Sequence, residues 1–75
     1  MQTGDLDGAL LCVEDMLRIA PDAAALWREA ALLHQRLGPV AAALRGFEHF
    51  LALVPQGDAA QRARAAMEEL RARLN

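Results

Sequence analysis

The chain has 75 residues, of which 55% are hydrophobic, 24% charged and only 4% aromatic, and its formal net charge at pH 7 is −2. Because nucleic-acid binding requires a concentrated basic surface, this balance argues against DNA or RNA as a partner. The single cysteine excludes an internal disulfide, and the longest apolar run is far too short to cross a bilayer. We therefore expect one small domain over residues 1–75, located in the cytoplasm, with no membrane partner.

The first predicted helix covers residues 5–20, with Asp5 as the expected N-cap. Its apolar residues recur at intervals of three and four, which places them on one side of a helix. They are Leu6, Ala9, Leu10, Val13, Met16, Leu17 and Ala20.

The second predicted helix covers residues 23–37. Pro21 disfavours helical geometry in the residue before it, and Asp22 can accept hydrogen bonds from the free N–H groups of the next helix. At the other end, Gly38 can adopt a positive φ that ends the helix, and Pro39 fits the first turn of the one that follows.

The third predicted helix covers residues 39–54, and the fourth covers residues 58–74 after a second break. Asp58 and Gln61 have the spacing of a capping box. The fourth helix has small apolar residues and many charges, with the pairs Arg64–Glu68 and Glu69–Arg73 four residues apart. Such a helix can bury one side and expose the other to water, as the last helix of an array must.

Several residues recur after 34 positions. The pairs are Gly4 and Gly38, Leu6 and Val40, Ala9 and Ala43, Leu10 and Leu44, Leu17 and Leu51, and Pro21 and Pro55. A fixed period of this length is typical of arrays of helical hairpins, in which each unit stacks on its neighbour. The sequence thus predicts an all-α fold of four antiparallel helices: half a repeat, a full repeat and a C-terminal capping helix.

The segment 27–55 resembles the tetratricopeptide repeat. The matching residues are Trp27, Ala31, Gly38, Ala43, Phe47 and Pro55, and Gly4, Ala9 and Pro21 match the second half of a preceding repeat. Ala30, His34 and Phe50 depart from the family's usual Leu, Tyr and Ala. The resemblance implies an α-solenoid that presents a concave surface to a protein or peptide partner.

More narrowly, the chain resembles the C-terminal tail of bacterial transglutaminase-like proteins, where degenerate repeats follow a papain-like domain. The features that carry this resemblance are the run from Gly4 through Ala9 to Pro21, the repeat after it and the Arg-rich last helix. It implies that the catalytic residues lie upstream of this chain.

The family resemblance also implies a partner-binding groove on the first helix of each repeat. Carried over residue by residue, the groove consists of Arg28, Leu32, Gln35 and Arg36 from the second helix and Arg62 and Glu69 from the fourth. Arg28 and Arg62 are themselves 34 residues apart. Two guanidinium groups on one wall could clamp an acidic peptide group through charge-assisted hydrogen bonds.

The sequence offers no arrangement typical of catalysis or metal binding. Cys12 has no recognisable base and orienting group, and the spacing of Cys12, His34 and His49 matches no zinc pattern. We expect no enzyme activity, no catalytic residue, no cofactor and no metal. His34 is expected to lie between helices and to use one ring nitrogen for a buried hydrogen bond, and Trp27 is expected to act as a wedge between helices.

Three functional hypotheses remain open. The first is a protein–protein interaction module that binds a partner peptide or packs on an enzymatic domain. The second is a homodimerisation segment, because the first helix begins in mid-repeat and its apolar side is expected to be half covered. The residues expected to self-associate are Leu6, Leu10, Val13 and Leu17. The third is the non-catalytic transglutaminase-like tail.

Overall fold

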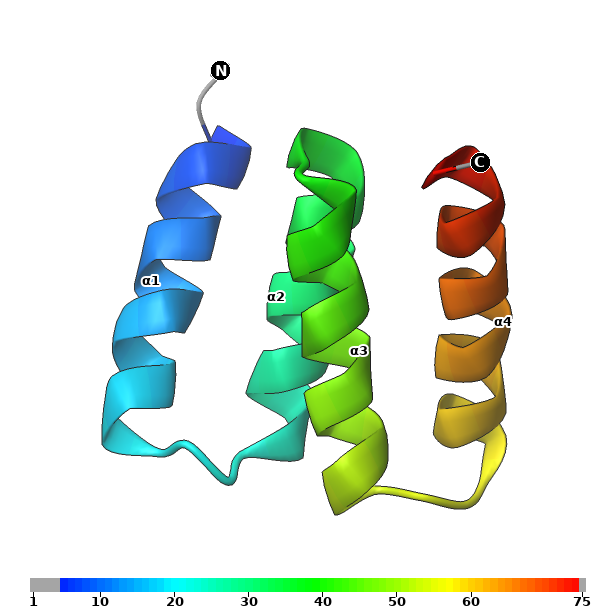
Figure 1. Cartoon of the computed structure of the whole chain (residues 1–75). Helices are drawn as coiled ribbons and strands as arrows, with labels where there is room; N and C mark the ends of the chain where they lie inside the picture. The colour runs from blue at the N-terminus through cyan, green and yellow to red at the C-terminus, as the bar shows by residue number, and fades with distance from the viewer. Residues whose placement is uncertain (1–4, 75) are drawn as a thin grey trace.

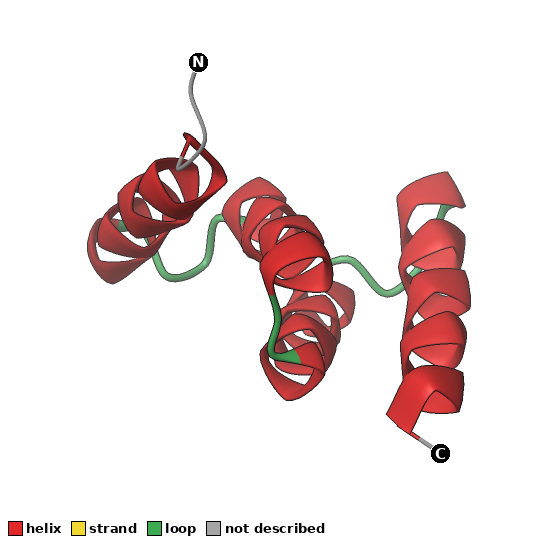
Figure 2. Cartoon of the chain, turned by 90° about the horizontal axis from the view of Figure 1, so that it is seen from above, coloured by secondary structure: helices red, strands yellow, loops and turns green. Residues whose placement is uncertain are grey.

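The computed structural model describes residues 5–74, which form four helices joined by short turns. The helices are α1 (Asp5–Ile19), α2 (Ala24–Leu37), α3 (Val40–Leu53) and α4 (Asp58–Leu74). Successive helices run in opposite directions, so that α2 and α4 run in the same direction (Figure 1). Seen end-on, α2 and α3 lie against each other in the middle, with α1 on one side and α4 on the other (Figure 2). The prediction of an all-α helical array is confirmed.

The array is thin, with extents of 33 × 31 × 18 Å, and its core lies between α2, α3 and α4. The α2 helix packs against both α1 and α3, and α3 packs against α4. The buried cluster consists of Ala31, Ala43, Phe47, Phe50, Ala63, Met67 and Leu70. Leu17 is the one buried residue of α1, so the first helix is the least covered of the four.

Small residues allow α2 and α3 to approach closely. A Cβ atom placed on Gly46 of α3 would lie 2.9 Å from the Cβ of Ala31 on α2. Ala31 and Ala43 are themselves fully buried. The contact between the two helices therefore depends on the missing side chain of Gly46, which the sequence did not reveal as a contact residue.

The α2 helix ends as expected and α3 begins one residue later than expected. Gly38 has φ 80°, and its N–H donates to the carbonyl of His34 at 2.6 Å. Pro39 is the N-cap of α3, with φ −74° and ψ 156°, and its carbonyl accepts from the N–H groups of Ala42 and Ala43. At this N-cap position the carbonyl of Pro39 accepts the first hydrogen bonds of the helix, and no hydrogen bond of the helix requires an N–H group there.

Two predicted side-chain caps are wrong. Ala23 is the N-cap of α2 and no side chain caps it, so Asp22 does not take this role. Asp58 is the first residue of α4, and Gln61 donates its N–H to the carbonyl of Gly57 at 3.0 Å. Gly57 has φ 107°, a conformation that glycine adopts without strain. The acidic side chain of Asp58 still lies in the first turn, where it interacts favourably with the helix dipole.

At the N-terminus, Asp5 is the first residue of α1 and not a residue preceding it. Gly4, the residue paired with Gly38 in the repeat, lies outside the described residues, as do residues 1–3 and 75.

The pairing of charged residues on α4 differs from the prediction. Neither Arg64–Glu68 nor Glu69–Arg73 forms an ion pair within residues 5–74. Instead, Arg64 donates from Nη2 to the carbonyl of Pro55 at 2.6 Å, and Arg71 lies 4.0 Å from Glu48 of α3. These side chains connect α4 to the preceding turn and to α3, because tertiary partners compete with neighbours on the same helix. None of the described helices is long and apolar enough to span a membrane.

Candidate functional site

A hollow of about 250 Å³ lies between α2 and α4. Its lining consists of Arg28, Leu32, Phe47, Ala59, Arg62, Ala63 and Ala66. Phe47 comes from α3 and is only 2% exposed, whereas Leu32 is 41% exposed. We call this site the α2–α4 groove.

Helical spacing brings the lining residues of the α2–α4 groove together. Arg28 and Leu32 are four residues apart and share one side of α2. On α4, the lining residues lie at intervals of three and four, which also places them on one side. Because three of the four α4 residues are alanines, their short side chains leave room between the helices.

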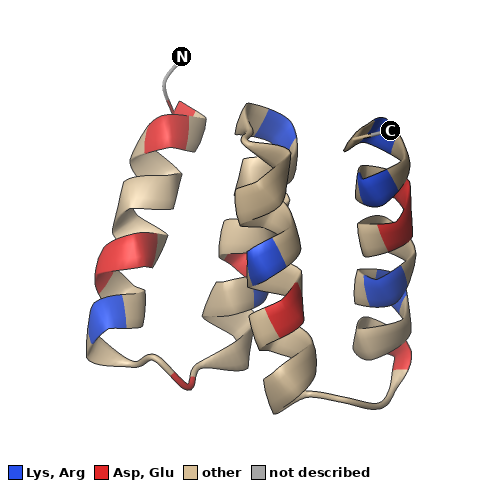
Figure 3. Cartoon of the chain, viewed as in Figure 1, with Lys and Arg blue, Asp and Glu red and all other residues tan. Residues whose placement is uncertain are grey.

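The two arginines of the α2–α4 groove are exposed and available to a ligand. Neither Arg28 nor Arg62 has a carboxylate within 4.0 Å in the part of the chain that the structure describes. Charge is distributed unevenly along the array, with acidic residues prominent on α1 and basic residues recurring along α4 (Figure 3). The groove thus combines an apolar floor with unpaired positive charge at its rim.

The structure brings together three of the six residues expected to form the groove. Arg28, Leu32 and Arg62 line it, whereas Gln35, Arg36 and Glu69 do not. The latter three lie farther toward the C-terminal ends of α2 and α4, so the hollow is shorter than the surface that the repeat pattern implied. Phe47 and the alanines of α4 complete the lining, although their apolar spacing had suggested only core positions.

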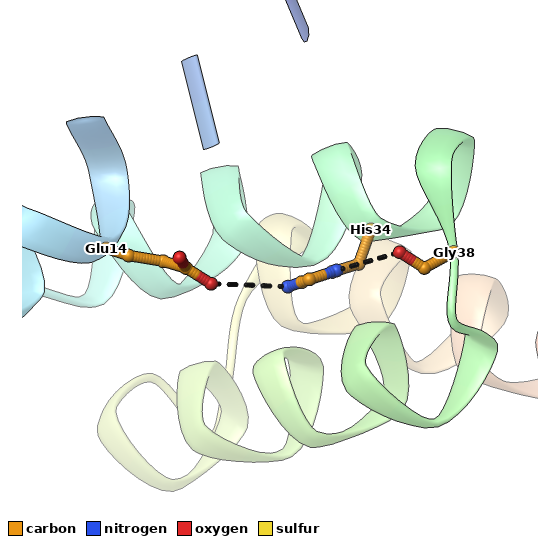
Figure 4. A network of polar contacts seen from close by, with 3 residues as sticks. All are labelled: Glu14, His34 and Gly38. Carbon is orange, nitrogen blue, oxygen red and sulfur yellow. Dashed lines mark hydrogen bonds and ion pairs between the residues drawn. The ribbon is translucent and has the colours of Figure 1, made fainter. Parts of the chain in front are cut away.

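A larger hollow of about 530 Å³ lies between α1, α2 and α3. His34 is the centre of its polar network (Figure 4). Its Nδ1 is 3.1 Å from the carbonyl of Gly38, which can only accept, so Nδ1 is the donor. Its Nε2 lies 3.8 Å from a carboxylate oxygen of Glu14 on α1. His34 thus forms a hydrogen bond, but this bond is only part-buried and joins the end of its own helix, whereas its other ring nitrogen faces the first helix.

Trp27 also connects elements at the larger hollow. Its Nε1–H donates to the carbonyl of Pro21 at 2.7 Å, and its ring stacks on His49 of α3 with 4.1 Å between centroids and 14° between planes. Arg18, another lining residue, lies 3.4 Å from Asp15. Because most polar groups here have partners within the chain, the larger hollow is chiefly a structural junction, and the α2–α4 groove is the better candidate for binding.

The four residues expected to self-associate differ in exposure. Leu17 is 9% exposed, Leu10 and Val13 are half-buried, and Leu6 is 38% exposed. Another apolar set on α1 is more open: Ala9, Cys12, Met16 and Ile19 are all exposed, the last two at 50% and 86%. The prediction that Ala9 and Met16 lie on the packed side with Leu17 is therefore wrong. The α1 helix therefore has two apolar sides, and the one named from the sequence is the better covered.

The described residues contain no group of three or more His, Cys, Asp or Glu side chains arranged to hold a metal ion. Cys12 is an exposed free thiol.

Comparison with known proteins identifies the architecture. A family model described as tetratricopeptide repeat matches residues 1–73, nearly the whole chain. No curated protein and no solved structure gives a significant match, and nothing found supports the narrower resemblance to transglutaminase-like tails. The match agrees with the four helices, the period of 34 and the close contact between Ala31 and Gly46. The chain belongs to the tetratricopeptide repeat family.

Proposed function

We propose that the chain is a protein–protein interaction module whose α2–α4 groove binds a partner peptide. The proposed peptide carries an apolar side chain with carboxylate groups close to it. The observation that supports this choice is the position of Arg28 and Arg62, one repeat apart, at the rim of a hollow with Phe47 in its lining.

The chemistry of the α2–α4 groove favours such a ligand. The apolar side chain would displace water from the surface formed by Leu32, Phe47 and the alanines of α4. Guanidinium groups bind carboxylates through paired, charge-assisted hydrogen bonds, which are stronger than neutral ones. Since the groove residues are on helices and not on loops, little ordering is needed when the peptide binds.

Family membership also bears on catalysis. Tetratricopeptide repeats are typically non-catalytic interaction modules. We propose accordingly that this chain acts by binding a protein or peptide and not as an enzyme.

Selection of short peptides from a random display library, followed by fluorescence anisotropy, tests the groove. We expect the selected peptides to combine Asp or Glu with an apolar residue. The double variant Arg28→Glu, Arg62→Glu should weaken their binding at least about tenfold, because it replaces attraction by repulsion.

The double variant Arg18→Glu, Arg45→Glu is the matched control. It makes the same change in net charge with two exposed arginines that line the larger hollow. Binding to this control should stay within about twofold of wild type. Equal losses in both double variants would show that general charge and not the α2–α4 groove determines binding, and selection of no peptide would contradict the proposal.

Two finer proposals concern the setting in which this module works. One is that the array packs on an enzymatic domain as the tail of a transglutaminase-like protein, in the cytoplasm. The gene sequence upstream of Met1 tests it, because a papain-like domain must be encoded there. The other is self-association through α1, which makes the chain a homodimerisation segment as well as an interaction module.

A further inference from the structure

The α1 helix exposes an apolar surface that we call its outer face, formed by Ala9, Cys12, Met16 and Ile19. All four residues are exposed, and Ile19 is 86% exposed. Their spacing of three and four places them on one side of the helix, away from Leu17, the residue that α1 buries. An exposed apolar side of this kind marks a binding surface.

The repeat shows what the outer face is shaped to contact. The residues 34 positions later on α3 are Ala43, Gly46, Phe50 and Leu53, of which the first three are buried. There, Ala43 and Phe50 join the core cluster with Ala31 of α2, and Gly46 meets Ala31 directly. The same positions on α1 are therefore shaped to pack against another helix, and no helix of the described chain covers them.

We propose that the outer face of α1 pairs with the outer face of α1 in a second copy, in antiparallel orientation about a two-fold axis at Cys12. This inference deepens the proposed self-association and does not depend on the peptide groove. It replaces Leu6, Leu10, Val13 and Leu17 by another side of the same helix as the contact surface.

Near the axis, the outer face is complementary in size to its own antiparallel copy, and at its ends Ile19 of one copy lies opposite Asp5 of the other. With the axis at Cys12, Gly8 of one copy lies opposite Met16 of the other. No atom of the described residues lies within 4 Å of a Cβ placed at Gly8, so space for the methionine is open. The two Cys12 side chains meet at the axis, where short side chains allow close approach of the backbones. In a parallel pair, by contrast, each methionine would lie beside the other.

The charges of α1 favour the antiparallel pair as well. The first turn carries Asp5 and Asp7, and the last turn carries Arg18. Antiparallel pairing keeps the two acidic first turns apart and places each near Arg18 of the other copy, whereas parallel pairing places the two acidic turns together. The exposed residues of α4 are mainly charged, so head-to-tail stacking of α1 on α4 would leave the outer face of α1 against polar groups.

Analytical ultracentrifugation of the full chain and two point variants tests the surface. Met16→Glu places a charge within the proposed contact, opposite Gly8 of the other copy, and should raise the dimer dissociation constant at least about tenfold. Leu11→Glu is the matched control, because Leu11 is 64% exposed on the same helix but outside the outer face. The control should change this constant less than about twofold, and circular dichroism checks that both variants keep their helices.

Oxidation of the thiol gives an independent measurement. The wild type should form a disulfide-linked dimer through Cys12 under mild oxidation with diamide. The variant Cys12→Ser, Leu11→Cys moves an exposed thiol by one residue, away from the axis, and should cross-link at least about tenfold more slowly.

Three results would overturn this pairing: a strict monomer at high concentration, equal dissociation by both glutamate variants, or equal cross-linking of both thiols. The salt dependence of binding distinguishes the test of the α1 pairing from the test of the α2–α4 groove. Added salt should weaken the binding of acidic peptides, whereas an apolar contact between two acidic helices should hold or strengthen. Each proposal can therefore fail while the other stands.

Discussion

Gly46 is the residue on which the contact between α2 and α3 depends. The apolar period of the sequence places the core side of α3 correctly, but a glycine within a helix looks like a weak position when read alone. Its role follows from the distance to Ala31, 2.9 Å from a Cβ placed at Gly46. Such a distance depends on how two helices cross, which the pattern along one helix does not contain.

Replacement of Gly46 by alanine should lower the free energy of unfolding by about 1–2 kcal/mol. The steric clash of the new methyl group with Ala31 should destabilise the fold by more than the higher helix propensity of alanine stabilises it. Gly8→Ala should instead raise the free energy of unfolding by about 0.5–1 kcal/mol, since no atom of residues 5–74 lies within 4 Å of a Cβ at this position. Urea denaturation at low protein concentration measures both, and the double variant Ala31→Gly, Gly46→Ala should recover part of the loss. Equal effects at the two glycines would contradict the close contact.

The end of α2 shows how much a short segment of sequence can specify. Gly38 and Pro39 predicted a helix end and a helix start, and the structure has both. Pro39 was expected in the first turn of α3 but is its N-cap, and the helix begins at Val40. The caps at Asp22 and Asp58 could not be judged in the same way. A carboxylate caps a helix only where the local backbone places it near the free N–H groups. At these two turns the N–H groups of Ala23 and Gln61 donate to backbone carbonyls instead.

The junction of α2 with α1 and α3 should depend on His34 more than on Glu14. His34→Ala removes the hydrogen bond to Gly38 and should lower the free energy of unfolding by about 1–2 kcal/mol. Glu14→Gln keeps that bond and removes only a distant pair with an exposed carboxylate, so it should cost less than about 0.5 kcal/mol. Thermal denaturation of the two variants compares them. A larger effect of Glu14→Gln would mean that the contact with α1, and not the end of α2, is the important one.

The α1 helix shows where a pattern along the sequence stops being informative. Its apolar residues fall on two sides, and either side could have been the one that packs on α2. The side with Leu6, Leu10 and Leu17 was expected to be half covered, and in the structure Leu6 is 38% exposed, Leu10 is half-buried and Leu17 is buried. Three-dimensional packing decides the matter, since Leu17 is buried and Ile19 is not.

The whole array behaves as a row of contacts between neighbouring helices, and its two ends differ. The capping helix α4 buries Ala60, Ala63, Met67 and Leu70, whereas α1 buries one residue. The free energy of unfolding of such a row is approximately the sum of the stabilities of its repeats and of the contacts between neighbouring helices. Because a chain this short has few such contacts, the one between α3 and α4 is essential. The position of Arg28 opposite Arg62 also belongs to this scale, and the repeat period predicted it because successive repeats stack with similar orientation.

Truncation of Leu70 should destabilise the whole array. Leu70 of α4 is fully buried in the core. Leu70→Ala should lower the free energy of unfolding by about 2–5 kcal/mol, enough to unfold much of a small domain. Leu74→Ala is the control on the same helix, with a side chain 59% exposed, and should change stability by less than about 0.5 kcal/mol. Circular dichroism at 25 °C measures the loss of helix. A folded Leu70→Ala variant of normal stability would show that α4 is not needed.

The scarcity of buried side chains on α1 has a consequence for motion. A segment held by few apolar contacts can detach while the rest remains folded, so its amide hydrogens exchange with deuterium through a local opening. We expect the amides of α1 to exchange faster than those of α3 by more than about tenfold in dilute solution. If two copies pair through α1, raising the protein concentration should slow this exchange in α1 and leave α3 unaffected.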